Sequence, residues 1–494
     1  MGFQKTPAAV ALAITLIIWF IPAPEGVAAN AWHLLAIFIG IIAGIIGKAM
    51  PIGAMAILAM TIVALLQVTV PEIDPKTNLP FKNPHVQAVK DALSPLNSTL
   101  IWMIGVAIML SRGLLKTGLG TRIGYLFLSL FGKNTIGIAY SLCLSDLLIA
   151  PVTPSNTARG GAIVHPIMKA IATSFDSDPE KGTQNRLGRY LALVNYHANI
   201  ITCIMFVTAT APNSLAAELI AKATNNEVQL TWTTWFVAMV VPGLVAMAVM
   251  PLVLFFMYKP EIVNTPDAPA MAREKLKAMG KMSGQEKIVL AVFGVLLFLW
   301  AGLSDTLLGI KIDATTTTFL GLSLFLLTGV LTWDDVLKEK GAWDLVIWFA
   351  ALVMMANFLN QLGLIKWLSN SAGQGIEHLG LSWYWACALL AVVYIYAHYI
   401  FASGTAHVTA MLGAFYAVGL HLGAPPMLFA LMLAAGTGIM LSLTHYASGV
   451  SPVIFGSGYT TMGEFWTAGF VMSVVELIIF ATVGLGWWKV LGYW

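Results

Sequence analysis

Charged residues are scarce in this sequence. Of its 494 residues, 10% are Asp, Glu, Lys or Arg and 58% are hydrophobic, and the mean hydropathy is +0.82. Soluble globular domains carry about 25% charged residues, so this composition excludes an ordinary soluble protein. Because many apolar runs reach the roughly 20 residues that a membrane crossing needs, the sequence predicts an all-α polytopic membrane protein.

Cysteine is also rare, and its spacing excludes several kinds of site. The three cysteines, Cys143, Cys203 and Cys387, lie in apolar runs and form no CxxC or Cys/His ligand pattern. This excludes a disulfide framework and a zinc site, so we expect small packing residues and no metal or cofactor. A cleavable signal peptide is not apparent either, and we interpret the first apolar run, residues 8–23, as a transmembrane helix.

Eleven segments are long and apolar enough to be predicted as transmembrane helices. They begin near Val10, Trp32, Ile52, Thr99, Leu187, Trp232, Lys287, Thr316, Trp343, Met427 and Phe465.

Two further apolar regions, residues 136–172 and 381–422, do not fit this count. Each holds two arms that meet at a short polar stretch, SNTAR or SGTAH. The first pair of arms runs about fifteen residues each, roughly 22 Å of helix, which is short for separate crossings. We therefore predict two re-entrant helical hairpins with the polar stretches at their tips.

The distribution of basic residues predicts the orientation in the membrane. With a cytoplasmic N-terminus, eighteen of the twenty-six Lys and Arg residues fall on the inside and seven on the outside, and Arg159 belongs to a hairpin tip. Basic residues accumulate in cytoplasmic loops. We expect a multi-pass protein of the cell inner (plasma) membrane with its C-terminus outside.

The chain repeats itself weakly on either side of a polar cytoplasmic linker, residues 259–286. LIWMIGVAIML at Leu100 matches VIWFAALVMMA at Val346, and PSNTA at Pro154 matches ASGTA at Ala402, at nearly the same offset. After an N-terminal helix in residues 1–30, the repeats are predicted to cover 31–258 and 287–494. Each holds five crossings and one hairpin, so the second copy is inverted, as in secondary transporters.

A helix unsuited to continuous hydrogen bonding follows each hairpin. The first, residues 187–223, contains TATAPNS, and the second, residues 427–462, contains THYASGVSP. Proline removes a backbone donor, and Asn, Ser and Gly favour turns. We therefore expect broken helices, whose exposed backbone groups must line a protein-buried, wet cavity.

Hairpin tips and helix breaks together predict an anion site. Free N–H groups at helix N-termini suit carboxylates, and two facing tips suit a substrate with a carboxylate at each end. The expected substrate-binding residues are Ser155, Asn156, Thr157, Ser403, Gly404, Thr405, Thr208, Pro212, Asn213, Thr444 and Ser448.

Paired SNT-like tips with broken helices in an eleven-helix inverted repeat resemble the divalent anion/sodium symporter family. SNTARGG and ASGTAH are most similar to its branch of citrate/succinate, tartrate/succinate and oxoglutarate/malate exchangers. The resemblance covers nearly the whole chain and implies a homodimer and an elevator motion. It also implies di- or tricarboxylate substrates: succinate, malate, 2-oxoglutarate, citrate or tartrate.

One departure from the family concerns sodium. Sodium-coupled members carry SNT in both tips, but Gly404 replaces Asn in the second tip here. Arg159 and His407 lie two residues beyond Thr157 and Thr405, and with His398 they are candidates to supply the charge that sodium supplies elsewhere. We therefore expect sodium-independent exchange, with a sodium-coupled dicarboxylate symporter as the alternative.

Simpler roles compete with each of these assignments. The hydroxyls of the tips and breaks could pack between helices or satisfy their own backbone, Arg159 could snorkel to water, and the histidines could be ordinary packing. Asp146 and His165 lie at similar distances from Ser155, so we expect a structural pair across the hairpin rather than a proton relay.

Other function classes receive little support. The spacings of His398, His407 and His445 match no metal-ligand motif, so we do not expect an enzyme. A channel is disfavoured because inverted repeats with broken helices suit alternating access. We expect neither a nucleic-acid partner nor a cofactor.

Overall fold

The computed structural model describes residues 2–71, 73, 79, 81–377 and 381–494, with side chains omitted for 372–377. The described chain forms two compact units. Unit 1 comprises residues 1–105, 340–390 and 406–424, and unit 2 comprises 106–339, 391–405 and 425–494. Each unit takes segments from both predicted repeats. Lys76, one of the lysines expected outside, is not among the described residues.

Unit 1 is built from helices of the chain's beginning and its second half. Its elements are α1 (Lys5–Phe20), α2 (Ala29–Ile46), α3 (Ile52–Leu66), α4 (Pro84–Leu93), η1 (Ser94–Asn97), α17 (Lys340–Gln361), α18 (Leu364–Glu377), η7 (Val408–Leu412) and α21 (Gly413–His421). Helix α1 packs on α2, α3 on α17, and α18 on α21.

Small residues let α1 and α2 approach closely. A Cβ atom at Gly40 would overlap the hydroxyl of Thr15, and one at Gly44 would lie 3.6 Å from the Cβ of Ala11, both on α1. The spacing of Gly40 and Gly44 is the small-xxx-small pattern of membrane helix pairs. At the same interface, the rings of Trp19 and His33 stack at 3.9 Å.

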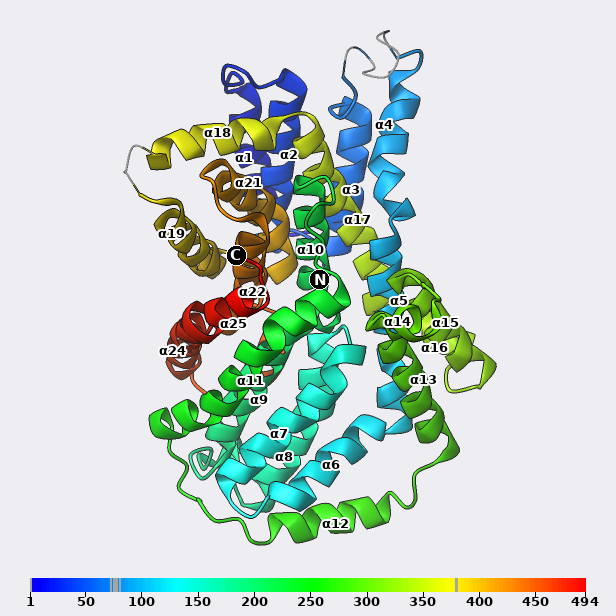
Figure 1. The fold of residues 1–494 in the computed structure, drawn as a ribbon, viewed down its shortest axis with the longest axis vertical. Helices are drawn as coiled ribbons and strands as arrows, with labels where there is room; N and C mark the ends of the chain where they lie inside the picture. Colours follow the sequence, from blue (N-terminus) through cyan, green and yellow to red (C-terminus); the bar gives the residue numbers. More distant parts are fainter. Residues whose placement is uncertain (1, 72, 74–78, 80, 378–380) are drawn as a thin grey trace. The chain divides into compact units, whose positions relative to one another are not determined.

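Unit 2 holds most of the expected site residues. Its elements are α6 (Leu119–Phe131), α7 (Thr135–Ile149), η2 (Ala150–Val152), η3 (Thr157–Val164), α8 (His165–Ser174), η4 (Pro179–Lys181), α9 (Gly188–Met205), η5 (Val207–Ala209), α10 (Ala211–Ala223), α11 (Trp232–Met257), α12 (Ala268–Ala278), α13 (Gly284–Trp300), α14 (Leu303–Leu308), α15 (Ala314–Leu327), α16 (Trp333–Leu337), η6 (Ala397–Ile400), α22 (Pro426–Ile439), η8 (Met440–Ser442), α23 (Ser451–Phe455), α24 (Met462–Ile479), η9 (Phe480–Gly484) and α25 (Leu485–Val490). Helices α7 and α8 lie beside α9 (Figure 1).

Three helices contribute to both units, namely α5 (Thr99–Thr117), α19 (Trp383–Tyr396) and α20 (Gly404–His407).

Seven helical segments of the described chain are long and apolar enough to cross a membrane. They are Ala29–Ile46, Thr99–Thr117, Thr135–Val152, Trp232–Met257, Lys340–Gln361, Trp383–Ile400 and Met462–Val490, and shorter apolar helices include α1, α3, α6, α15 and α22. Each of the eleven expected crossings starts in a helix or one residue before it. The protein is therefore helical and apolar as expected, and the count of eleven crossings stays a prediction.

The first arm of the first predicted hairpin contains α7, whose 15 residues agree with the length expected from the sequence. Helix α7 passes directly into the 3-10 turn η2, because a proline is tolerated in the first turn of a new helical segment. Together they form an 18-residue helical stretch that is long and apolar enough to cross a membrane, so the re-entrant hairpin stays a prediction.

The linker contains a helix that the sequence analysis did not predict. Helix α12 packs along α6, at the bottom of the view in Figure 1. Arg122 of α6 donates to Glu286 at 2.6 Å and to the carbonyl of Gly280 at 2.9 Å. Glu286 also completes a capping box with Ser283 at the start of α13. These bonds fasten the end of the linker to α6.

A second ionic cluster connects α5 to α16. Lys116 donates to Asp335 at 2.6 Å, and Arg112 lies 3.1 Å from Glu339. Asp335 also accepts the backbone N–H of Thr332 at 2.9 Å, as part of a capping box. The hydrogen bond from Lys116, followed by that from Thr332, holds the pKa of the Asp335 carboxyl well below its usual range.

We predict that Asp335→Asn destabilises the protein at neutral pH by no more than about 1 kcal/mol, because the ion pair is partly solvated. A depressed folded pKa contributes stability above the unfolded value of about 3.9, and that stability is lost as pH falls below it. The difference in melting temperature from wild type should therefore shrink between about pH 5 and pH 3.

The neighbouring Asp334→Asn is the matched control, since Asp334 forms an exposed pair with Lys338. It should change the melting temperature less. A loss of stability in Asp335→Asn that is equal at all pH values would contradict the prediction.

Candidate functional site

The polar stretch expected at the first hairpin tip lies at the interruption between η2 and η3. Residues 153–155 leave helical geometry, Asn156 resumes it, and a π-helical turn, η3, follows. The hydroxyl of Ser155 accepts the backbone N–H of Ala158 at 3.2 Å, which caps the new turn. Ser155 and Thr157 are half-buried, and Asn156 is 8% exposed. The tip thus presents two partly accessible hydroxyls.

The second tip has the same order of elements. The 3-10 turn η6 precedes an interruption at residues 401–403, α20 begins at Gly404, and the π-helical turn η7 follows. Ser403 is half-buried and Thr405 is 5% exposed. The same sequence of turns therefore recurs at the two positions that the sequence repeat relates.

Each tip packs on the break of the helix from the other repeat. A Cβ atom at Gly449, in the second break, would overlap the hydroxyl of Thr157 in the first tip. A Cβ atom at Gly404, in the second tip, would lie 3.3 Å from Pro212 at the first break and 2.7 Å from Leu441. Unit 2 therefore brings both tips against both breaks, and this reciprocal packing defines the candidate site.

The first break lies between α9 and α10, where the sequence predicts it. Asn213 donates to the carbonyls of Cys203 at 2.6 Å and Phe206 at 3.0 Å. Thr208 donates to the carbonyl of Pro151 at 2.7 Å. Both side chains thus bond backbone groups left free at the break and at the end of the first hairpin arm.

The second break covers residues 443–450, between η8 and α23. Tyr196 of α9 bonds the carbonyl of Leu441 and, at 2.9 Å, the hydroxyl of Ser451. The hydroxyl of Ser448 lies 3.0 Å from that of Ser451. Ser448 is half-buried and Gly449 is exposed, so this break reaches the surface of the described structure.

Thr444 and His398 lie at the buried part of the second break. Thr444 is fully buried. His398, also fully buried, lies 3.1 Å through Nε2 from the carbonyl of Ala447. His398 therefore joins the end of the second hairpin's first arm to the second break, as Thr208 joins the first arm to the first break.

Arg159 is fully buried and bonds only protein groups. Its Nε donates to the carboxylate of Asp146 at 3.0 Å. Its Nη1 donates to the carbonyls of Thr153 at 2.7 Å and Ala209 at 3.0 Å. Its Nη2 donates to the hydroxyl of Thr202 at 3.2 Å and the sulfur of Cys203 at 3.3 Å. A guanidinium has five N–H donors, and five bonds engage them all. In this structure Arg159 has no donor left for a substrate.

The expected pair of Asp146 and His165 is not formed. Asp146 accepts from Arg159 and Thr202, and its other oxygen accepts from Asn199 at 3.0 Å. His165 instead lies 3.4 Å from Asn195. The expectation was wrong because it assumed two regular helical arms, whereas the π-helical turn η3 changes which side chains of the second arm face α7.

Several residues of this region were not predicted from the sequence. Asn199, Thr202 and Tyr196 all lie on α9, whose polar side chains gave no pattern apart from the break itself. Glu476 on α24 was also missed, although an acidic residue inside an apolar segment is itself a signal. His407 is fully buried and belongs to unit 1, whereas Ser403, Gly404 and Thr405 belong to unit 2.

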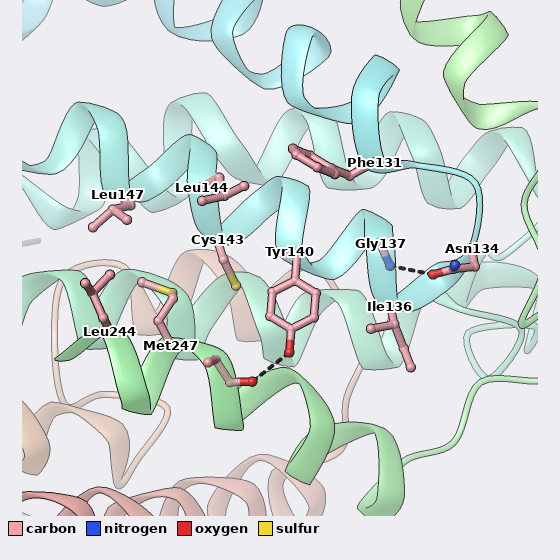
Figure 2. A pocket seen from close by; sticks show the side chains of 11 residues that line it. Phe131, Asn134, Ile136, Gly137, Tyr140, Cys143, Leu144, Leu147, Leu244 and Met247 are labelled. Carbon is pink, nitrogen blue, oxygen red and sulfur yellow. Dashed lines mark hydrogen bonds between the residues drawn. The ribbon is translucent and has the colours of Figure 1, made fainter. Parts of the chain in front are cut away.

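A groove of about 610 Å³ between α7 and α11 is of a different kind (Figure 2). Leu144, Leu147 and Met247 line it, and its two polar lining side chains are engaged: Asn134 accepts the backbone N–H of Gly137 at 2.7 Å, and Tyr140 donates to the carbonyl of Ala248 at 2.6 Å. Both flanking segments are apolar enough to cross a membrane. The groove therefore suits hydrocarbon, and none of its described lining residues offers a charged donor to a carboxylate.

The sequence is similar to known transporters along nearly its whole length. Residues 4–494 match the family model described as the sodium:sulfate symporter transmembrane region. The chain is 46% identical over 491 residues to the Bacillus subtilis (strain 168) protein named "Putative malate transporter YflS", covering 99% of this chain and 97% of that protein.

A plastid relative and two solved structures extend the comparison. The chain is 41% identical to dicarboxylate transporter 1, chloroplastic, of Arabidopsis thaliana, over 100% of this chain and 84% of that protein. Two solved structures share the fold alone. The YdaH transporter of Alcanivorax borkumensis has a TM-score of 0.56 and 13% identity, and the match covers 90% of this chain and 98% of that one. MtrF of Neisseria gonorrhoeae has a TM-score of 0.52 and 13% identity, and the match covers 88% of this chain and 94% of that one. The whole-chain family match and the close relatives show that the chain belongs to the divalent anion/sodium symporter family of multi-pass membrane transporters.

Proposed function

We propose that this protein exchanges dicarboxylates across the membrane without sodium. The reciprocal packing of tips and breaks in unit 2 carries the proposal. It gathers the half-buried hydroxyls of Ser155, Thr157, Ser403 and Ser448 together with the exposed backbone at Gly449. Two separate sets of neutral donors suit an anion with a carboxylate at each end, and the names of the relatives point to the same substrates.

The second tip supports sodium-independent exchange. Gly404 lies against Leu441 and Pro212 so closely that even a Cβ atom would displace a neighbour. An asparagine, whose amide oxygen would be a cation ligand, does not fit there without rearrangement. The two tips therefore differ in ligand chemistry, and a sodium site built from both tips would lack one of its oxygens.

The remaining features belong to the same proposal. The repeated order of 3-10 turn, interruption and π-helical turn favours two hairpins related by an inverted repeat. We propose that eleven crossings and two hairpins form an elevator-type carrier that works as a homodimer, with its N-terminus in the cytoplasm. Malate, succinate, 2-oxoglutarate, citrate and tartrate all fit the two-ended site.

Arg159 has a positioning role in this proposal. Its charge is paired with Asp146, and its bonds reach the carbonyl of Thr153 beside the first tip and that of Ala209 at the first break. It therefore fixes the tip against the break, so that Ser155 and Thr157 keep their places. His407 and His398 remain proposed as charge-compensating residues of the second half.

Transport assays in proteoliposomes test the proposed exchange. Uptake of labelled succinate into proteoliposomes should require unlabelled succinate inside and should be equal in sodium and in choline buffers. Accumulation in empty liposomes under a sodium gradient would show the alternative, a sodium-coupled symporter. Uptake that does not saturate would indicate a channel.

A second prediction tests the positioning role. Asp146→Asn leaves the guanidinium of Arg159 buried without its counterion, and removing one partner of a buried pair costs about 3–5 kcal/mol. We expect a strongly lowered melting temperature in detergent and low abundance in membranes. His165→Gln is the matched control on the same hairpin and should not reproduce this loss, because His165 does not contact Asp146. Equal losses of stability in the two variants would refute the positioning role of the pair between Asp146 and Arg159.

A third prediction concerns the contact between the first tip and the second break. Gly449→Ala places a methyl group where the Thr157 hydroxyl lies, so substrate affinity should fall while folding is preserved at this exposed position. We expect the succinate concentration that gives half-maximal uptake to rise about tenfold, which corresponds to a loss of about 1.4 kcal/mol of binding free energy. Gly463→Ala, whose Cβ would meet no atom within 4 Å, should leave transport unchanged. A wild-type half-saturating succinate concentration in Gly449→Ala would show that Thr157 is not part of the substrate site.

A further inference from the structure

Glu476 is an acidic side chain inside the membrane segment α24, and the transport site described above does not use it. It is 0% exposed. The hydroxyl of Ser442 lies 3.2 Å from its Oε2, and its Oε1 has no hydrogen-bond partner among the described residues. A buried carboxyl with one weak contact is unusual, because buried polar groups are normally paired.

No cation of the described chain pairs with Glu476. Helix α24 packs against α9, α11, α22, η8 and η9, and its side chains also contact Tyr396 of α19, Tyr399 of η6, and His445 and Tyr446 of the second break. Helices α11 and α22 and turns η8 and η9 carry no titratable side chain, and α9 carries Arg189, Tyr190, Tyr196, His197 and Cys203.

The arginine on α9 serves another acid. Arg189 lies 2.7 Å from Glu464, which is twelve residues before Glu476 on α24, or about 18 Å along a helix. An isolated carboxylate transferred to such a site would cost many kcal/mol. The uncharged, protonated acid avoids this cost and can donate to Ser442.

Glu476 also lies directly on the second helix break. Ser442 is the last residue of η8, immediately before the break. A Cβ atom at Gly469, on the same helix as Glu476, would lie 2.9 Å from the carbonyl of Leu443 and would overlap that of Ser442. The contact between α24 and the break thus includes backbone, hydroxyl and carboxyl groups, and the far side of the break reaches the surface of the described structure at Gly449.

We propose that Glu476 is a proton-binding site linked to the second helix break. The neutral carboxyl packs against Ser442 and keeps α24 on the break. When the carboxyl gives its proton to water admitted through the break, the resulting carboxylate needs further donors, so the packed arrangement is no longer favoured. Proton binding at Glu476 therefore controls the movement of the second break. This inference rests on the proposed transport function.

The test is the pH dependence of exchange in proteoliposomes, between about pH 6 and 9, the range reached by buried carboxyl groups. Wild type should lose exchange about fivefold or more as pH rises, because loss of the proton unpacks the second break, which carries part of the proposed substrate site. Exchange by Glu476→Gln, which mimics the protonated acid, should stay within about twofold of its value at acid pH, because the glutamine amide does not titrate in this range. Glu218→Gln is the control, since Glu218 is a partly exposed acid paired with Lys222, and it should keep the wild-type profile.

Two outcomes would overturn the proposal: a flat profile in wild type, or a wild-type profile in Glu476→Gln. Succinate titrates equally for all variants, so the comparison isolates the side chain. Ser442→Ala provides a second variant and should shift the midpoint of the profile, because it removes the hydrogen bond to the carboxyl.

An infrared pH titration of the purified protein separates this inference from the transport function. A protonated-carboxyl C=O band should titrate in wild type and in Glu218→Gln and be missing in Glu476→Gln. The same band in all three proteins would refute the proton site even if exchange is observed. Its selective loss, combined with no succinate exchange by wild type, would uphold the proton site and refute the proposed function.

Discussion

The ion pair between Asp146 and Arg159 is the interaction on which the first half of the site depends. Both side chains are fully buried and lie 3.0 Å apart. A charge inside a membrane protein is tolerated only when it is paired and its remaining donors are used. Arg159 meets this condition by bonding the carbonyls of Thr153 and Ala209 as well as side chains of α9. Because these carbonyls belong to the first tip and the first break, satisfying the charge also determines where both lie.

The second half reaches a similar geometry with different chemistry. Its break is held by Tyr196, by His398 and by the contact of Ser442 with Glu476. No arginine is available there, and the tip carries Gly404 where the first tip has Asn156. Hydroxyls, a histidine and one acid without an ion pair among the described residues hold the second break, so the proposed proton site makes its stability more sensitive to pH than that of the first. Two repeats with one architecture thus differ in how firmly each is fixed.

The sequence was sufficient for features that follow from local chemistry. Pro212 and Asn213 in one apolar segment, and Ser448, Gly449 and Pro452 in another, mark breaks that the structure contains. The matching polar stretches at Ser155 and Ser403 coincide with two further helix interruptions, which we predict to be hairpin tips. The eleven apolar runs likewise correspond to helices. These predictions succeed because proline and glycine act on their own backbone, whatever surrounds them.

Pairings between distant side chains depend on helical phase, which composition does not reveal. The partner of Asp146 was misidentified because residue counting treats both arms as regular helices, whereas η2 and η3 wind differently. Helix α12 was missed for another reason: its sequence is polar, and its stability depends on packing against α6. Glu476 was overlooked because apolar neighbours hide a single acid in a hydropathy profile.

The reciprocal packing of tips and breaks bears on why such a carrier would exchange rather than transport in one direction. Thr157 meets the second break at Gly449, and Gly404 meets the first break at Pro212, so movement of one tip disturbs the break of the other repeat. Donors that bind a carboxylate are left unsatisfied when the site is empty, and unsatisfied donors are costly away from water. If sodium does not bind the empty site, a carboxylate that binds for the return step satisfies these donors with the smallest cost in free energy. The proposed exchange then follows from the same neutral donors that we propose bind the substrate.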